Sequence, residues 1–211
     1  MLQLNIFHKA ARQVKASGKS AIAITVLFVV STSSALAALP SIGEFTSDMT
    51  KKDGLIPVYY DDESDKVYLA VPTDHAEYLF QSSLPYGVGS NDIGLDRGQL
   101  GDTRLVSFEK FGNKVLLKQH NTKYRAVHGG DAEKQSIDEA FADSVIAGFT
   151  LVAKSDSASL IDYTPFLLSD IHGIGNRLAA TNQGSFGVDK MRSGVYLPKT
   201  KGFEKNTELE L

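Results

Sequence analysis

The sequence of 211 residues contains no cysteine. This absence excludes disulfide bonds, and it also excludes zinc sites and nucleophiles that depend on cysteine. The folded core must therefore hold by packing alone. Hydrophobic residues make up 42% of the chain and charged residues 22%, which are ordinary values for a globular protein. This length supplies one core, and a second full domain is not expected.

The sequence also lacks the His-Glu-x-x-His motif, in which two histidines one helical turn apart bind zinc and the glutamate acts as a base. None of the five histidines is followed by glutamate, and no two are four residues apart. His120 and His128 lie near predicted strand ends and could meet in space. We expect them to be solvated or at the core edge, with metal ligation as the less favoured alternative.

Three further patterns fall short of functional motifs. Ser107-x-x-Lys110 lies in a predicted strand, whereas the serine of that motif belongs at a helix start; in Gly184–Gly187 the serine stands one place too early for a nucleophile elbow. The acidic stretch Asp61–Asp65 lacks the ligand spacing and glycine of a calcium-binding loop, so a hairpin turn is favoured. We therefore assign no catalytic, cofactor-binding or metal-binding residue.

The first 37 residues have the layout of a secretory signal peptide. A basic region without acidic residues precedes the apolar run Ala21–Val30, and small residues ending in Ala35-Leu36-Ala37 follow. This order predicts cleavage near Ala37 and an exported protein, periplasmic or secreted. An uncleaved membrane anchor is the alternative, although Thr25 and Ser31–Ser34 dilute the apolar run.

Removal of residues 1–37 leaves an acidic chain. The whole sequence has 22 basic and 25 acidic residues, and the removed segment carries 4 basic and no acidic ones, so the net charge becomes 18 − 25 = −7. Nucleic-acid binding needs clustered lysine and arginine and is not expected. No basic amphipathic stripe is present either, so we expect no stable membrane span after signal cleavage.

The mature sequence predicts a mainly β to α+β fold, with antiparallel hairpins and two or three short helices. Residues 38–53 are expected to be a loose leader or linker ahead of a β-rich domain at 54–211. Ser136 and Glu139 form a capping-box pattern that predicts a helix to about residue 146, and Thr164-Pro165 begins another. Gly112-Asn113 suits a two-residue hairpin turn. Strands are predicted at 55–60, 66–71, 104–111, 114–119, 149–153 and 160–163, with shorter ones at 124–127 and 194–197.

Residues Asn206–Leu211 alternate polar and apolar, as a half-buried strand does. We interpret this pattern as a domain truncated at its C-terminal end.

The most unusual stretch is the glycine-rich segment Gly87–Gly101. It has no Gly-Lys-Ser/Thr phosphate-binding sequence and no third glycine at the dinucleotide spacing. A structural loop, shaped by Asp96 and Arg97, is favoured over a ligand site.

This segment resembles a block in bacterial zinc-dependent metalloproteases that carry a domain of unknown function ahead of a metzincin-like catalytic domain. Similar blocks follow in order at 121–126, 141–149, 160–170 and 203–208, after an opening hairpin at 54–71, so the resemblance covers about 54–211. In the loop it rests on Gly87, Gly89, Asn91, Asp92, Gly94, Asp96, Arg97 and Gly98.

The resemblance implies a β-rich accessory domain, with zinc and the His-Glu-x-x-His helix in a catalytic domain downstream. Nothing in this chain corresponds to that helix, and Glu204 stands where family members often have proline. No zinc ligand or catalytic base is therefore carried over. The implied partners are the downstream catalytic domain of the same parent protein and a peptide or protein substrate.

We therefore favour a non-catalytic N-terminal accessory module of an exported zinc-dependent metalloprotease, acting in folding, docking or substrate holding. The alternative is a free-standing exported binding protein that uses the Gly87–Gly101 loop. An independent hydrolase with an unrecognised site is the third hypothesis.

Overall fold

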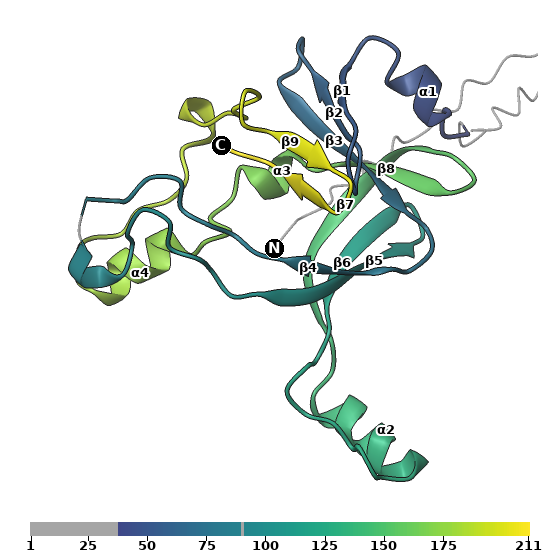
Figure 1. The fold of residues 1–211 in the computed structure, drawn as a ribbon, viewed down its shortest axis with the longest axis vertical. Helices are drawn as coiled ribbons and strands as arrows, with labels where there is room; N and C mark the ends of the chain where they lie inside the picture. The colour runs from purple at the N-terminus through teal and green to yellow at the C-terminus, as the bar shows by residue number, and fades with distance from the viewer. Residues whose placement is uncertain (1–37, 90) are drawn as a thin grey trace, which may run out of the picture. The chain divides into compact units, whose positions relative to one another are not determined.

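The computed structural model describes residues 38–89 and 91–211 (Figure 1). The predicted signal peptide, residues 1–37, lies outside this part of the chain and stays a prediction. Ala38–Leu211 forms one unit. None of the helices within the described ranges has both the length and the apolar character needed to span a membrane.

Eight strands form one antiparallel sheet in the order β1-β2-β3-β8-β7-β6-β5-β4, which confirms the expected β-rich fold (Figure 1). Four short α-helices accompany it, one more than expected: α1 (Ile42–Phe45), α2 (Asp131–Ala140), α3 (Thr164–Leu167) and α4 (Ile174–Ala180). Short 3-10 helices lie at Asn91–Ile93 and Lys190–Arg192. The strands are β1 (Thr50–Lys52), β2 (Val58–Asp61), β3 (Lys66–Pro72), β4 (Glu77–Phe80), β5 (Arg104–Phe111), β6 (Lys114–Gln119), β7 (Ser144–Lys154) and β8 (Ala158–Asp162).

The β5–β6 hairpin has the bounds predicted from the sequence. Phe111 pairs with Lys114, so that Gly112 and Asn113 form the turn. Gly112 has a φ of +61°, a left-handed conformation that glycine adopts at low cost. The turn residues and the alternation of the two strands thus specify the same register.

β3 lies inside the sheet and is buried on both faces. Val67, Leu69 and Val71 face the main core, which they share with apolar residues of β2, β5, β6, β7 and β8. Tyr68 and Ala70 face a second, smaller cluster on the opposite side. The continuous apolar run of β3 follows from this two-sided burial.

Residues 38–53 are not the loose leader that we expected. A capping box between Ser41 and Glu44 begins α1, and Phe45 packs edge-on against Tyr68 with ring centroids 5.3 Å apart. β1 then pairs with β2. The polar composition of this segment suggested a loose leader. In the structure α1 covers the second cluster and β1 forms one edge of the sheet.

β7 joins the two halves of the sheet. Its pairing with β8 shifts register between Leu151 and Ala153, and such bulges bend a strand. α3 follows β8 as predicted, but its N-cap is Tyr163 rather than Thr164. The Thr164 hydroxyl instead bonds to β3, because it accepts a hydrogen bond from Val67 N at 2.9 Å.

Predictions between β6 and β7 were partly wrong. The helix predicted over 136–146 is α2, which begins at Asp131 after the N-cap Gly130, so the predicted capping box at Ser136 does not form. It ends at Ala140, because Ser144 and Val145 pair with β6 as part of β7. Strand pairing thus overrides the local helical pattern. No strand forms at 124–127, where Asn121 Oδ1 accepts bonds from Lys123 N and Tyr124 N in a turn. The strand predicted at 194–197 is also absent.

A two-stranded hairpin, β9 (Lys201–Phe203) and β10 (Asn206–Glu208), packs against the segment before β2. Leu55 N donates to Phe203 O at 2.7 Å, and the backbones at Gly54 and Gly202 approach too closely for a Cβ atom. The predicted strand 206–211 therefore ends at Glu208, and Leu209 packs on the main core. This packing accounts for the apolar alternation there.

Candidate functional site

The glycine-rich segment belongs to the long connection between β4 and β5, whose two ends run antiparallel. Gly101 N donates to Ser82 O at 2.8 Å, and Gly98 N donates to Leu84 O at 2.7 Å. Leu84 N donates in turn to Gln99 O at 3.0 Å. The connection is thus a closed loop with its own backbone ladder.

This loop has a small core of its own, which it shares with α4. Leu84, Ile93 and Leu95 are buried, and Ile174 and Leu178 of α4 pack against them. Arg177 also donates from Nε to Ile93 O at 2.6 Å. Two segments far apart in the sequence are thereby held together. α4 was not predicted, because after Gly173 the sequence shows little periodicity.

Eight residues of the loop carry the family resemblance, and we call them the signature-loop residues. The glycines among them allow backbone conformations that other residues rarely adopt. Gly89, Gly94 and Gly98 have φ values of +91°, +69° and +82°, where a side chain is strained. A Cβ atom on Gly87 would lie 3.2 Å from Arg97 N. Asn91 and Asp92 lie in the 3-10 helix.

We expected Asp96 and Arg97 to shape the loop, but among the described residues their side chains form no bond that fixes it. Asp96 accepts from Gln99 N through its carbonyl, while its carboxylate oxygen Oδ1 is buried with no hydrogen-bond partner in the described part of the chain. The Arg97 side chain is exposed and forms no ion pair with a described residue. The backbone ladder and the shared core determine the loop shape instead.

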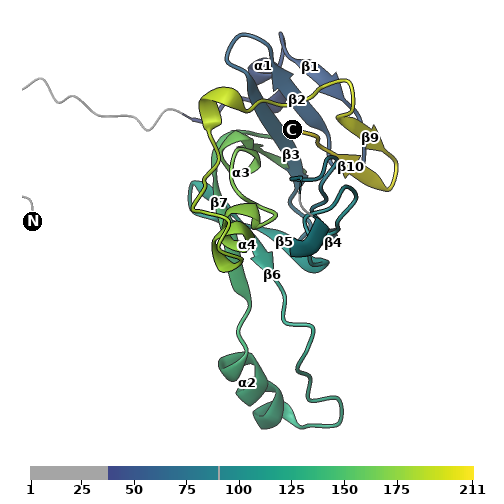
Figure 2. The same cartoon turned by 90° about the vertical axis from the view of Figure 1, so that its left-hand side faces the viewer.

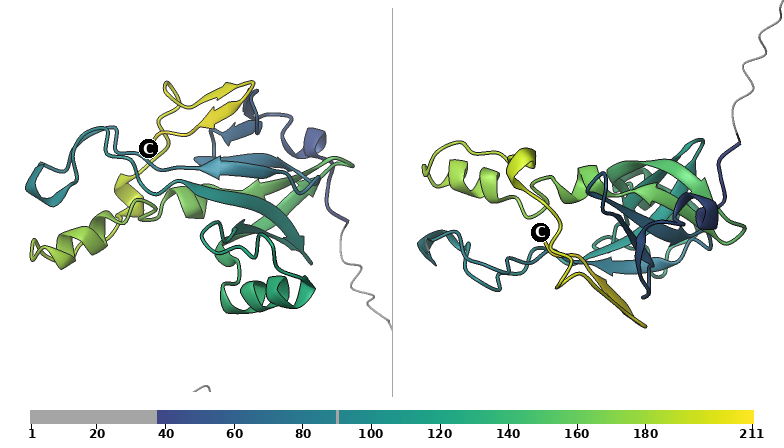
Figure 3. Two further views of the ribbon diagram at one scale, coloured as in Figure 1. Left: turned by 60° about the horizontal axis from the view of Figure 1, so that its bottom comes forward. Right: turned by 90° about the horizontal axis from the view of Figure 1, so that it is seen from above.

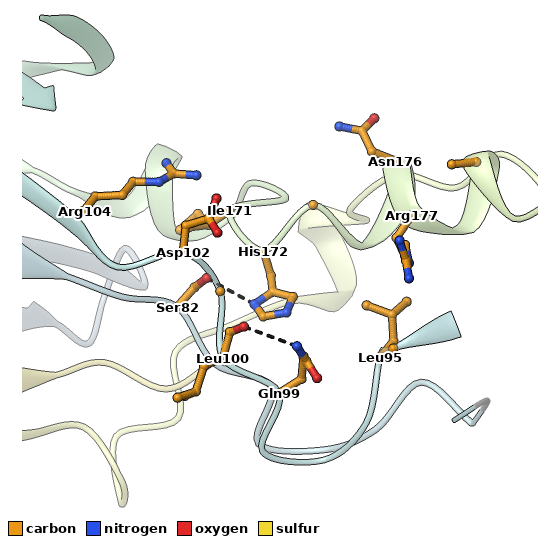
Figure 4. A pocket seen from close by; sticks show the side chains of 14 residues that line it. Ser82, Leu95, Gln99, Leu100, Asp102, Arg104, Ile171, His172, Asn176 and Arg177 are labelled. Atoms are coloured by element: carbon orange, nitrogen blue, oxygen red, sulfur yellow. Dashed lines mark hydrogen bonds between the residues drawn. The ribbon is translucent and has the colours of Figure 1, made fainter. Parts of the chain in front are cut away.

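A pocket of about 560 Å³ lies between this loop and α4 (Figure 4). His172 stands at its centre, and its Nδ1 lies 3.1 Å from the Ser82 hydroxyl. A Cβ atom at Gly101 would collide with that hydroxyl, so any other residue there would push the Ser82 side chain away from His172. We call this site the loop pocket. Sequence reasoning missed it because His172, Arg104 and Arg177 occur in no recognisable motif.

Charge in the loop pocket is mainly positive. Arg104 and Arg177 line it together with one carboxylate, that of Asp102. Neither arginine forms an ion pair with any residue that the structure describes. Apolar side chains, among them Leu95 and Ile171, complete the wall. Such a pocket can hold an anionic group with an apolar neighbour.

A second polar cluster lies at the ends of β6 and β7. His120 Nε2 is 2.9 Å from the Ser107 hydroxyl, and His120 Nδ1 is 2.8 Å from Asp143 Oδ2. Asp143 Oδ1 accepts from Asn121 N at 3.0 Å. Lys118 lies 3.7 Å from the same Asp143 carboxylate. We call this cluster the polar clamp, because it joins residues 120–121 to residue 143.

Burial alone would raise the pKa of Asp143, but its bonds from Asn121 N and His120, together with the charge of Lys118, hold that pKa below its ordinary value. The carboxylate is therefore ionised at neutral pH, and it fixes the orientation of the imidazole.

The polar clamp has the bond order of a serine–histidine–aspartate triad, yet it is not arranged for catalysis. Ser107 is only 3% exposed and lies in β5 with paired strands on both sides. A nucleophile must reach a substrate carbon, with donors placed for the developing oxyanion. Buried in the middle of a sheet, the hydroxyl offers no such approach. Ser107-x-x-Lys110 is indeed in a strand, as predicted.

No metal site is apparent in the described residues, which contain no group of three or more histidine or acidic side chains placed to bind an ion. His120 is engaged in the polar clamp, and His128 is exposed. In the acidic turn, the Asp61 carboxylate accepts from Glu63 N, and Asp65 accepts from the Tyr60 hydroxyl at 2.6 Å. These aspartates shape the hairpin, as predicted.

The polar clamp holds a segment that stands away from the sheet. Residues 121–143, which we call the arm, contain α2 and lie beyond the ends of β6 and β7 in both views (Figures 1 and 2). No residue of α2 is buried, and only Ile137 is half-buried. Tyr124 stacks on Phe141 with ring centroids 3.8 Å apart, and Val127 is 74% exposed.

These features define a β-sheet domain with a polar pocket and an exposed helical arm. Residues 98–211, more than half of the chain, match the family described as "Domain of unknown function (DUF5117)", and the chain belongs to this family. The match contains β5 to β10, the arm and α4, whereas of the eight signature-loop residues it contains Gly98 alone. No curated protein and no solved structure matches the chain.

Proposed function

We propose that this protein is a non-catalytic accessory domain of an exported zinc-dependent metalloprotease, and that it docks on the catalytic domain through the arm. The observation that carries the docking is α2, a helix of 10 residues of which none is buried. The protease parent is supported by the resemblance of several sequence blocks, and export by the layout of residues 1–37.

α2 has little to stabilise it within this chain. Its N-cap is Gly130, which has no side chain to accept a hydrogen bond from the free amides at the helix start. An isolated helix shorter than about 12 residues is marginal in water, and most helices gain their stability from packing an apolar face. A helix of this kind, in a segment whose base is held by the polar clamp, is suited to pack on another protein.

The arm also indicates the chemistry of its partner. α2 carries Asp131, Glu133, Asp138 and Glu139 against a single Lys134. Val127, Tyr124 and Phe141 add exposed apolar surface beside this acidic helix. A basic surface with an apolar centre complements it, and we assign that surface to the catalytic domain.

The test is a binding measurement between this chain and a separately expressed, zinc-loaded catalytic domain from a bacterial metalloprotease in which these sequence blocks precede His-Glu-x-x-His. Val127→Asp should weaken association at least about tenfold, because it places a charge in an apolar contact. Phe111→Asp is the matched control, since Phe111 is 71% exposed but lies at the β5–β6 turn. Absence of association, or equal losses in both variants, would overturn the proposal.

The claim that this domain is non-catalytic is tested with casein as the substrate. The chain alone should not cleave it, with or without a zinc chelator. Chelator-sensitive cleavage by the purified chain would instead establish the independent hydrolase.

The alternative of a free-standing binding protein is supported by the loop pocket, which is lined by Ser82, by residues 94–95 and 99–102 of the loop and by α4. A chain that binds a ligand in this pocket but shows no association with the catalytic domain would favour that alternative.

A further inference from the structure

We propose that the loop pocket binds the carboxylate of a peptide, with the Arg177 guanidinium as anchor and Arg104 as a supporting charge. The inference is independent of the docking proposed above, because α4 with its loop and α2 lie at different sides of the sheet (Figures 1 and 3).

Arg177 is oriented before any ligand arrives. Its Nε donates to Ile93 O at 2.6 Å, and Ile93 is itself buried in the core that the loop shares with α4. This bond uses one donor and leaves the two terminal nitrogens of the guanidinium for a ligand. A guanidinium held in this way loses little conformational freedom on binding, and its planar fork matches a carboxylate.

The charge balance favours a monoanion. Arg104 and Arg177 supply two positive charges and Asp102 one negative charge, which leaves a net charge of +1 without His172. A single carboxylate neutralises this charge, whereas a phosphate dianion would leave an excess next to Asp102. The rest of the mature chain is strongly acidic, so an anion finds little other attraction.

The pocket is larger than a carboxylate. Its volume of about 560 Å³ falls in the range of small-molecule sites, and Leu95, Leu100 and Ile171 line it beside the arginines. In Figure 4 the Arg104 and Arg177 side chains lie on either side of His172. An apolar side chain next to the carboxylate would therefore be covered as well. The ligand is a peptide that ends in an apolar residue, or one with an acidic side chain beside an apolar residue.

Asn176 offers a test that leaves the fold intact. It lines the pocket, is exposed, and its side chain forms no hydrogen bond with another described residue. Asn176→Lys should strengthen binding of a carboxylate, and Asn176→Asp should weaken it, each by about threefold. Opposite effects at one position cannot come from loss of folding.

The experiment is a calorimetric titration of the protein with acetyl-Ala-Ala-Leu, with its C-terminal amide, and with the amide of acetyl-Ala-Glu-Leu. The free acid should bind and its amide should not; binding of the glutamate amide would identify an acidic side chain as a second source of the carboxylate. Arg104→Gln and Arg177→Lys should each reduce the affinity about tenfold. Arg97→Gln, on the same loop but outside the pocket, is the matched control.

Inorganic phosphate is titrated in parallel. Equal affinity for the acid and both amides, an equal loss in Arg97→Gln, or tighter binding of phosphate than of the peptide acid would overturn the proposal. Stronger binding in Asn176→Lys and weaker binding in Asn176→Asp, seen only with the peptides that carry a carboxylate, would establish the proposal.

Discussion

His120 and Asp143 form a contact of 2.8 Å between Nδ1 and Oδ2, and this contact joins the two ends of the arm. The same carboxylate accepts from Asn121 N at 3.0 Å. β6 and β7 diverge beyond this point, so the polar clamp determines where the sheet ends and where the arm begins. The base of the arm is therefore fixed by three residues, His120, Asn121 and Asp143.

The polar clamp should make stability depend on acid pH. The pKa of Asp143 is lowered in the folded protein, so its stabilising effect is complete above the unfolded value of about 4 and is lost as the pH falls through the folded value. Asp143→Asn should therefore be less stable than wild type by about 1 kcal/mol at pH 6, with a difference that shrinks towards pH 2. Urea unfolding at several pH values measures this. A difference that grows on acidification would contradict the assignment.

Ser107 should matter for stability rather than for hydrolysis. Ser107→Ala removes the bond to His120 Nε2 and should cost about 1 kcal/mol of unfolding free energy. Hydrolysis of p-nitrophenyl acetate should be the same for wild type and variant, because the buried hydroxyl does not reach the ester. If the wild type turned over this ester and the alanine variant did not, the triad would be catalytic after all.

Gly101 should be sensitive to replacement, because a side chain there collides with the Ser82 hydroxyl. Gly101→Ala forces the Ser82 hydroxyl away from His172 and should destabilise the protein by about 1–3 kcal/mol. Gly187→Ala is the control, since a Cβ atom there meets nothing within 4 Å. Thermal unfolding followed by circular dichroism compares the two. Equal melting temperatures would show that the loop yields without cost.

The core should respond to loss of volume as a packed interior does. Leu117 is 1% exposed, so Leu117→Ala should cost about 2–5 kcal/mol of unfolding free energy. Leu79→Ala, at a position 76% exposed on β4, should change it by less than about 0.5 kcal/mol. Chemical denaturation gives both values. Similar losses at the two positions would mean that the core is placed wrongly.

The sequence predicted those parts of the fold in which local and long-range preferences agree. The β5–β6 hairpin was placed correctly because Gly112-Asn113 and the flanking alternation specify one register. The helix at 136–146 was misplaced because the apolar spacing of Ile137, Phe141 and Val145 fits a helix, whereas pairing with β6 draws Ser144 onward into β7. Such pairing depends on residues far away in the sequence and leaves no local pattern.

The candidate site was predicted only in part. The glycine-rich segment was predicted to be a structural loop, and three of its glycines have positive φ. The pocket itself depends on α4 folding back over the loop, with Arg177 reaching Ile93 across more than 80 residues. No spacing in the sequence encodes that contact, so Arg177, His172 and Arg104 could not be brought together from the sequence alone.

Hydrogen exchange of α2 tests the central claim most directly. In the free chain the amides of Asp131–Ala140 should exchange rapidly, since no residue of this helix is buried. Addition of the zinc-loaded catalytic domain should protect them, while β9 and β10 remain unchanged. Strong protection of α2 in the free chain, or no protection after the catalytic domain is added, would contradict docking through the arm.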